Sequence, residues 1–398
     1  MSKTEMPSIR FYGFDNDWEQ RKLGDNIAEY TEKTTINNQY PVLTSSRRGI
    51  FFQTDYYDGN QIASADNTGY NIVPYGYFTY RHMSDDEIFH FNINDITENG
   101  IVSTLYPVFT TDENLDSRYL QYQLNYGKEF AKYAVLQKQG GSRTYMYLNK
   151  LKELRLTIPN FVEEQKKISA YFMKLDNFIT LHQRKFEKLT NVKKSMLEKM
   201  FPQNGSCYPA VRFKGFTGPW ERRKFGDVFE EYSEKNRADL PPLTIIQGSG
   251  TIRRDESERA LQYDKASLSN YKVVNEGDLI VHLRSFEGGL EKANSQGIIS
   301  PAYHTFHGEG VDSRFYYTYF RSKNFIDTDL KPHVYGIRDG RSIDIEGMKT
   351  IEIPFTSYPE QKLIGDAIDS INTLISLQRR ELEKLQSIKK ALLEKMFV

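Results

Sequence analysis

The strongest constraint in this sequence is a 38-residue segment that occurs twice. Residues 164–201 (EQKKISAYFMKLDNFITLHQRKFEKLTNVKKSMLEKMF) and 360–397 (EQKLIGDAIDSINTLISLQRRELEKLQSIKKALLEKMF) align at an offset of 196 without a gap, with 17 of 38 positions identical. A second pair precedes them: residues 7–34 and 209–236 agree at 15 of 28 positions, including the only two tryptophans, Trp18 and Trp220. A period this long is not a solenoid repeat, so the chain consists of two halves with the same order of segments.

Each copy of the 38-residue segment predicts one long helix. Apolar residues recur at steps that alternate between four and three, the pattern of a coiled-coil seam. The expected seam positions are Ile168, Phe172, Leu175, Ile179, His182, Phe186, Leu189, Ile364, Ile368, Ile371, Ile375, Gln378, Leu382 and Leu385. At roughly 1.5 Å per residue each helix would be about 55 Å long. One helix cannot bury its own stripe, so we expect the two copies to pair antiparallel.

The seam is interrupted by a polar residue at the same place in both copies, His182 and Gln378. Each is the midpoint of its helix. One interpretation is a tolerated polar seam residue. The other is a pair that meets at the centre and fixes register, as single polar seam residues do in coiled coils.

The repeats divide the chain into four parts, residues 1–157, 158–203, 204–352 and 353–398. In the first and third parts, short runs such as residues 77–80, 87–93, 278–283 and 297–300 are typical of strands separated by turns. The expected fold class is α+β, with two mixed α/β globules separated by two long antiparallel helices in a pseudo-twofold arrangement. A common frame with divergent loops, held at a fixed separation, suits a protein that reads two different things at once.

The composition further limits the kinds of protein to which this chain can belong. The 53 Lys and Arg residues balance the 53 Asp and Glu residues, so nucleic-acid binding would have to use local patches. The single cysteine, Cys207, excludes an internal disulfide. The first residues, MSKTEMPSIRF, contain no apolar run typical of a signal peptide, and no run approaches membrane-spanning length. We therefore expect a cytoplasmic protein.

Catalytic signatures are missing from the sequence. Residues 239–243 (DLPPL) come nearest to the loop of adenine methyltransferases, but the residue order is wrong and the aromatic residue is missing. No Walker motif and no dinucleotide-binding glycine pattern occurs. His82 and His90 lie near acidic residues without metal-ligand spacing, so we interpret them as surface residues and expect no metal site. We therefore expect a chain that is not an enzyme.

The divergent loops carry arginine, lysine and polar residues beside glycine, which is the chemistry that reads base edges and phosphates. The DNA-binding candidates in the first half are Ser45, Ser46, Arg47, Arg48, Arg81, Gln139 and Arg143. Those in the second half are Arg253, Arg254, His282, Arg284, Lys331, His333, Arg338 and Arg341. Any one of them could instead be solvated or structurally paired. Arg118 and Arg314 occur in a shared Asp-Ser-Arg motif and are interpreted as framework.

These features together resemble the DNA-specificity (S) subunit of a type I restriction–modification system. The resemblance rests on the doubled EQK…LEKMF helix, the segments around Trp18 and Trp220, the Ile-Pro exits at residues 158–159 and 353–354, and GDLIVHLR…GIISPAY in the second half. It covers nearly the whole chain. The first half departs from it with PYGYFTYRH in place of GDLIV, which leaves the loop geometry there open.

The resemblance implies two target recognition domains, each reading one half of a split double-stranded DNA site. It implies that the helices set the spacer and dock two modification (M) subunits. S-adenosylmethionine would be bound by the M subunits, and ATP with Mg by the restriction (R) subunits of the full complex, with no cofactor on this chain. Two other interpretations are an adaptor whose coiled coil joins two protein- or glycan-binding domains, and a fused methyltransferase–specificity chain, for which no cofactor-binding domain fits.

Overall fold

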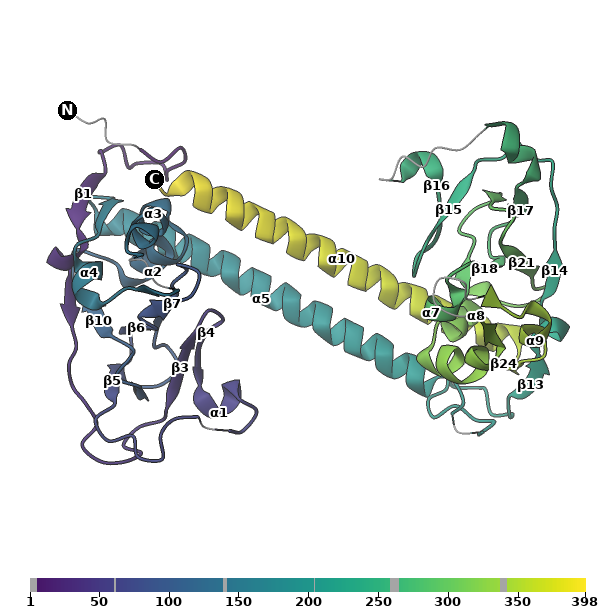
Figure 1. Ribbon diagram of the computed structural model, residues 1–398, viewed down its shortest axis with the longest axis horizontal. Helices are drawn as coiled ribbons and strands as arrows, with labels where there is room; N and C mark the ends of the chain where they lie inside the picture. The colour runs from purple at the N-terminus through teal and green to yellow at the C-terminus, as the bar shows by residue number, and fades with distance from the viewer. Residues whose placement is uncertain (1–5, 61, 139–141, 204, 258–264, 337–341) are drawn as a thin grey trace. The chain divides into compact units, whose positions relative to one another are not determined.

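The structure is a computed structural model that describes residues 6–60, 62–138, 142–203, 205–257, 265–336 and 342–398. The chain divides into two compact units (Figure 1): unit 1 comprises residues 1–182 and 380–398, and unit 2 comprises residues 183–379. Each long helix contributes one part to each unit. Within the described residues, no helix combines the length and the apolar character needed to cross a membrane.

Unit 1 is built from short strands and helices before its long helix. Its strands are β1 (Glu19–Lys22), β2 (Ile27–Glu29), β3 (Leu43–Ser46), β4 (Gly49–Phe52), β5 (Asn71–Pro74), β6 (Phe78–Tyr80), β7 (Met83–Ser84), β8 (Phe91–Ile93), β9 (Asn99–Val102), β10 (Val108–Thr111), β11 (Thr144–Tyr145) and β12 (Arg155–Ile158). Its helices are η1 (Leu23–Asp25), α1 (Gln53–Tyr56), α2 (Ser117–Tyr126), α3 (Lys128–Leu136), α4 (Leu148–Lys152) and the first part of α5 (Val162–Lys199).

Unit 2 repeats this order with its own lengths. Its strands are β13 (Glu221–Lys224), β14 (Glu230–Tyr232), β15 (Leu243–Ile246), β16 (Gly250–Arg253), β17 (Lys272–Val274), β18 (Leu279–Val281), β19 (Glu291–Lys292), β20 (Gly297–Ile299), β21 (His304–His307), β22 (Val334–Tyr335), β23 (Ser342–Ile343) and β24 (Glu352–Phe355). Its helices are α6 (Phe225–Val228), η2 (Arg254–Glu256), η3 (Lys265–Asn270), α7 (Ser285–Gly288), α8 (Ser313–Phe320), the π-helix η4 (Phe325–Leu330), η5 (Lys331–His333), α9 (Ile345–Lys349) and the first part of α10 (Tyr358–Met396).

The two units share one sheet topology. A four-stranded antiparallel sheet has the order β2-β10-β6-β8 in unit 1 and β14-β21-β18-β19 in unit 2. Three two-stranded pairs also correspond: β1-β12 with β13-β24, β3-β4 with β15-β16, and β5-β9 with β17-β20. The PYGYFTYRH departure in the first half is therefore a change of sequence on the same strand, β6, that β18 forms in unit 2.

Aromatic residues fill the core of each unit. Trp18 and Trp220 are both almost fully buried, at 2% and 3% exposure. Trp18 packs edge-on against Tyr119 of α2, and Trp220 packs against Phe315 of α8 at a ring separation of 5.5 Å. The shared residues around the tryptophans thus form matching cores.

The repeated Glu-Gln pair at the start of each long helix joins the helix to its unit. The buried Glu164 carboxylate accepts hydrogen bonds from the Arg10 guanidinium (2.8 and 2.9 Å) and from the Trp18 indole (3.4 Å). Gln165 accepts a bond from the Asp116 backbone N–H (2.8 Å) at the start of α2. Glu164 and Gln165 therefore join the start of α5 to the rest of unit 1, and this junction explains why Glu-Gln begins each copy of the repeat.

Unit 2 uses the same contacts at the start of α10. Glu360 accepts from the Arg212 guanidinium (2.7 and 2.9 Å) and from the Trp220 indole (3.1 Å). Gln361 accepts from the Asp312 backbone N–H (3.0 Å). The two junctions therefore have the same chemistry in both units.

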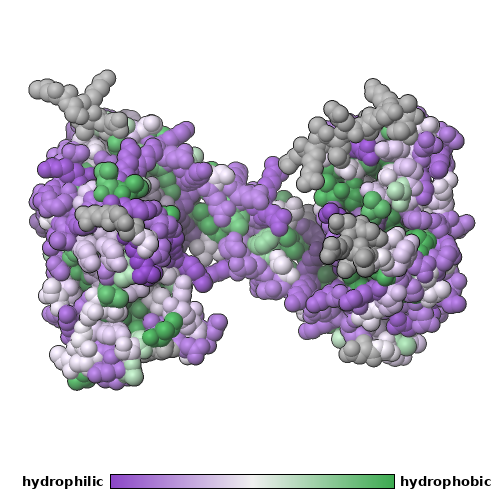
Figure 2. Space-filling model, in the orientation of Figure 1, coloured by the Kyte–Doolittle hydropathy of each residue, from purple (hydrophilic) through white to green (hydrophobic). Residues whose placement is uncertain are grey.

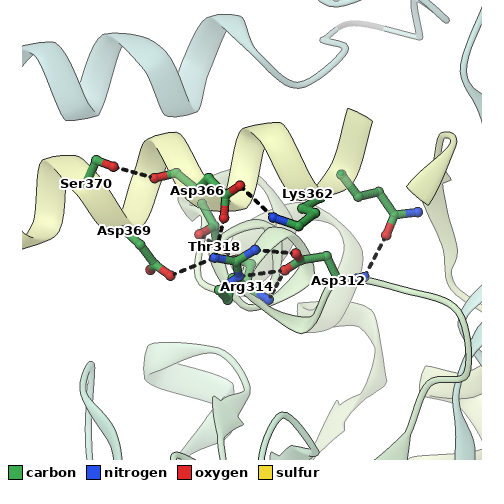
Figure 3. A network of polar contacts seen from close by, with 8 residues as sticks. Asp312, Arg314, Thr318, Lys362, Asp366, Asp369 and Ser370 are labelled. Atoms are coloured by element: carbon green, nitrogen blue, oxygen red, sulfur yellow. Dashed lines mark hydrogen bonds and ion pairs between the residues drawn. The ribbon is translucent and has the colours of Figure 1, made fainter. Parts of the chain in front are cut away.

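Arg314 adds a further contact between unit 2 and α10. Its guanidinium pairs with Asp312 and reaches across to Asp366 (2.7 Å) and Asp369 (3.3 Å) on the helix (Figure 3). These carboxylates raise its pKa. Arg314 thus acts as framework, whereas Arg118 of unit 1 pairs with Asp95 (2.8 Å) and donates to Gln121 of its own helix (3.1 Å).

The long helices pack antiparallel within each unit. In unit 1, Lys389 of α10 pairs with Asp176 of α5. In unit 2, the Arg379 guanidinium of α10 lies 5.5 Å from the Phe186 ring of α5. Every expected seam residue lies at a buried or half-buried position, including His182 and Gln378, whose mutual pairing stays a prediction. The predicted fold class, α+β with two long paired helices, is confirmed.

The Met-Phe end of each repeat is buried in a core. Phe397 packs between Phe172 and Tyr119, with ring separations of 5.7 Å to both. Phe201 packs against Trp220 and Phe315, at 6.0 and 4.9 Å. Helix α5 therefore starts in unit 1 and ends in unit 2, whereas α10 starts in unit 2 and ends in unit 1.

Candidate nucleic-acid interface

Unit 1 presents a tight hairpin formed by β3 and β4, which we call the first hairpin. Its register runs from Leu43 paired with Phe52 to Ser46 paired with Gly49, so Arg47 and Arg48 form a two-residue tip. Gly49 has φ of +122°, a backbone conformation that residues with a side chain rarely adopt, so the turn requires glycine at this position. The hairpin places two adjacent arginines at its exposed end.

The two tip arginines have different surroundings. Arg47 forms a bidentate ion pair with Asp86 and donates to the Ile88 carbonyl (3.3 Å). The Arg48 guanidinium lies over the rings of Phe51 (5.7 Å) and Tyr56 (5.2 Å). Arg47 is therefore oriented by a carboxylate, whereas Arg48 packs on two aromatic rings and forms no ion pair with the residues that the structure describes.

A hollow of about 620 Å³ lies beside this tip. Arg47, Arg48 and the exposed Arg81 line it together with Tyr56 and Tyr106. Hydrogen bonds from Arg47 and Ser84 lower the pKa of Asp86, so its carboxylate stays ionised and keeps Arg47 in place. Arginines beside aromatic rings can bind guanine edges or phosphates and stack on bases.

The other predicted residues of unit 1 lie elsewhere. Ser45 is buried, and its hydroxyl donates to the Thr79 carbonyl (3.0 Å). The Ser46 hydroxyl donates to the Gly49 carbonyl (3.1 Å) inside the turn. Arg143 pairs with Asp85 (2.8 Å) at a separate hollow of about 490 Å³, and Gln139 lies outside the described residues. The serines thus build the hairpin, and the arginines form its surface.

The interpretation of His82 as a surface residue is wrong. The ring is 7% exposed, bonds to the Leu105 carbonyl and stacks on Tyr147 at 5.0 Å. His90 is half-buried, and burial lowers its pKa. Sequence position near acidic residues did not indicate this, because the contacts come from residues that are distant along the chain.

Unit 2 presents the equivalent second hairpin, formed by β15 and β16. Its register runs from Leu243 paired with Arg253 to Ile246 paired with Gly250. The exposed tip is Gln247, Gly248 and Ser249. Gln247 lies against Gly288 of α7, where an added side-chain carbon would come within 2.1 Å of its amide nitrogen. The exposed Arg284 immediately precedes α7, so it lies on the loop beside the tip.

The predicted arginines of β16 and its end are at the base of the second hairpin. Arg253 pairs with Asp255 (2.9 Å). Arg254 donates to the Leu243 carbonyl (3.3 Å) and lies over the Tyr271 ring at 5.2 Å. Arg253 ends β16 and Arg254 begins η2, so both lie at the end of the hairpin opposite the tip, and both have partners within unit 2.

The remaining predicted residues of unit 2 are scattered. Burial of the His282 ring lowers its pKa to about 4, so at neutral pH it carries no charge to offer a phosphate. Lys331 is exposed and His333 half-buried on the short helix η5. Arg338 and Arg341 lie outside the described residues.

Sequence reasoning missed Gln247 and Ser249. A search for basic residues selected Arg253 and Arg254 instead. The signal was present: Leu43-Thr44 and Leu243-Thr244 match at an offset of 200, which puts Gln247-Gly248 at the positions of Arg47-Arg48. The divergence of the two tips is thus a difference in chemistry at one structural position.

The long helices expose a second set of apolar residues outside the seam. On α5 these include Phe178 (53% exposed) and Leu181 (47%). On α10 the residues 196 positions later, Leu374 (46%) and Leu377 (50%), are exposed as well. Figure 2 shows apolar atoms among hydrophilic ones on the visible surface of the helices. The two long helices therefore expose apolar residues at equivalent positions.

Within the described ranges, no group of three or more His, Cys, Asp or Glu residues could hold a metal ion.

Residues 15–191 match the family described as "Type I restriction modification DNA specificity domain". Two proteins of Methanocaldococcus jannaschii are similar in sequence. The putative type I restriction enzyme MjaX specificity subunit is 23% identical over 300 residues, which is 70% of this chain and 67% of that protein. The type I restriction enzyme MjaVIII specificity subunit is 25% identical over 407 residues, 95% of this chain and 91% of that protein.

A solved structure has the same fold. The crystal structure of the type I restriction-modification system S subunit from M. genitalium superposes with a TM-score of 0.59 at 12% identity, over 99% of both chains.

Proposed function

The chain belongs to the family of type I restriction-modification DNA specificity subunits, and from this we propose that each of its units reads one half of a bipartite double-stranded DNA site. The coarse role, DNA recognition within a type I system, is that of the family. The finer role, two half-sites with one unit for each, is our proposal.

One observation carries this proposal. The two units share one strand order, yet they present different chemistry at the same hairpin tip: Arg47-Arg48 in unit 1 and Gln247-Gly248-Ser249 in unit 2. Arginine pairs best with guanine, whereas glutamine pairs with adenine. A common frame with different tips is what two unlike half-sites require.

The helices would supply the spacer and the partner surface. Each is a single uninterrupted helix, α5 of 38 residues and α10 of 39. Their exposed apolar residues at equivalent positions support the docking of two M subunits, one on each copy of the surface. In this assignment the chain itself is not catalytic. S-adenosylmethionine would be bound by the M subunits, and ATP with Mg by the R subunits.

Mapping of methylated adenines across the genome of cells that express the chain with its M subunit tests the proposal. The expected result is a bipartite motif, two specified half-sites separated by a fixed unspecified spacer. A continuous motif, or no methylation when the complex is assembled, contradicts it. Absence of DNA binding by the assembled complex would favour the adaptor interpretation.

A further inference from the structure

Each hairpin is held by one buried polar residue at the same position of the same strand. β8 and β19 are the edge strands of the equivalent four-stranded sheets. Asn92 of β8 pairs with Thr79, and Glu291 of β19 pairs with Ile280. Two residues further on, the register matches again through two backbone bonds, Gly76 N–H to Asn94 O (2.8 Å) and Gly277 N–H to Ala293 O (2.9 Å). Asn92 and Glu291 are therefore equivalent.

Glu291 accepts bonds from the tip of the second hairpin. Its fully buried carboxylate accepts from the backbone N–H of Gly248 (2.7 Å) and of Gly250 (3.1 Å). Both glycines have positive φ, +88° and +78°, so the tip conformation depends on them. The same carboxylate accepts from the Tyr317 hydroxyl (2.9 Å) and pairs with Arg321. Four donors converge on one group.

Asn92 performs the opposite chemistry for the first hairpin. Its amide N–H groups donate to the Ser45 hydroxyl (2.8 Å) and to the Ser46 carbonyl (2.9 Å), the residue directly before the tip. Asn92 is 3% exposed. A donor therefore meets acceptors in unit 1, and an acceptor meets donors in unit 2.

This complementarity makes the two residues non-interchangeable. An isosteric change from amide to carboxylate, or the reverse, leaves buried polar groups facing groups of the same kind, which is costly away from water. The disturbed groups belong to the tip or adjoin it, so the side chains that the tip presents would move.

We propose that Asn92 and Glu291 are positioning residues that determine half-site specificity, each by holding the tip of the hairpin in its own unit. This proposal rests on the proposed DNA-reading function. It assigns specificity to two buried residues that do not touch DNA.

Two isosteric variants test the proposal in the full chain assembled with its M subunit. Glu291→Gln and Asn92→Asp are each assayed by competition binding with the duplex motif mapped for the wild-type complex and with duplexes altered in one half-site. Glu291→Gln is expected to reduce discrimination at one half-site by about tenfold, the order of one lost base contact. Asn92→Asp is expected to do the same at the other half-site, and each variant leaves the second half-site within about twofold of wild type.

A control separates positioning from loss of stability. Ile353→Val creates a small defect at a fully buried residue of β24 in unit 2, away from the hairpin. It should lower Tm without changing discrimination at either half-site. The proposal is overturned if Glu291→Gln discriminates at both half-sites as wild type does. It is also overturned if Glu291→Gln and Ile353→Val, compared at equal Tm, lose the same amount of discrimination. A wild-type complex without sequence preference would instead overturn the proposed function.

Discussion

Arg47 and Arg48 are neighbours in sequence and differ in what they can offer a ligand. The Arg47 guanidinium pairs with Asp86, 39 residues away, whereas the Arg48 guanidinium lies over Phe51 and Tyr56 and has no ion pair within the described part of the chain. Arg253 of unit 2 is paired with Asp255 at the base of its hairpin. Residue type alone therefore does not predict which of these arginines is available to a ligand, because that depends on the partners of each guanidinium.

Replacement of Arg48 by alanine should weaken specific DNA binding by the assembled complex by about 1–3 kcal/mol, the loss expected for one arginine contact to a base. The matched control is Arg253→Ala, which removes an arginine of similar exposure at the hairpin base and should change affinity by less than about 0.5 kcal/mol. Binding isotherms at constant salt measure both. Equal losses would place the DNA away from the first hairpin tip.

His282 predicts a pH dependence of stability in unit 2. Its pKa is lowered to about 4 chiefly by burial, with Arg321 and Arg284 contributing, whereas the unfolded residue titrates near 6.5. Between these values the unfolded state binds a proton and the folded state does not, so stability is lost as pH falls from about 6.5 to about 4.

The folding stability lost at pH 5 through His282 is about 1 kcal/mol, after a discount for partial exposure of the ring. Urea unfolding can be followed through Trp220 in a Trp18→Phe background at pH 7.5 and pH 5. His282→Gln should remove about this part of the pH dependence. An unchanged difference between the two pH values would contradict the assignment.

At the scale of elements, the Glu-Gln pairs explain why the long helices begin where they do. Glu164 and Glu360 each bind an arginine and a tryptophan indole, and each following glutamine caps a backbone N–H of the adjacent loop.

Glu164→Gln should destabilise unit 1, and Glu360→Gln unit 2, each by about 2–4 kcal/mol, because a half-buried arginine loses its buried counter-ion. Arg237→Gln, which breaks an exposed pair with Asp239, is the control and should cost less than about 0.5 kcal/mol. Hydrogen exchange resolved by residue measures the two units separately. Equal loss of protection in both units from a single variant would contradict the assignment of each junction to its own unit.

The exposed apolar residues of α10 predict a docking defect without a folding defect. Leu374→Glu combined with Leu377→Glu should reduce the number of bound M subunits, because charged side chains would replace a desolvated contact. Lys384→Glu, at an exposed position of the same helix, is the control for charge. Native mass spectrometry counts the M subunits. Full occupancy in the double variant would move the docking surface elsewhere.

At the scale of the whole molecule, the repeat predicted the frame because the repeated residues are those that build it. Trp18, Trp220, Glu164 and Glu360 are buried and recur. The proposed reading surface was harder to predict, because the hairpin tips lie outside the repeats. Ion pairs such as Arg47 with Asp86 join residues that only the fold brings together, whereas Arg253 and Asp255 are close enough in sequence for their pairing to have been anticipated.

The central claim is that each unit reads its own half-site and that the helices set the spacing between the half-sites without reading sequence. Exchange of residues 1–157 for those of another family member, followed by mapping of methylated adenines, tests it most directly. The account predicts that one half-site of the motif changes while the other half-site and the spacer length stay the same. A change in both half-sites, or in the spacer, would contradict it.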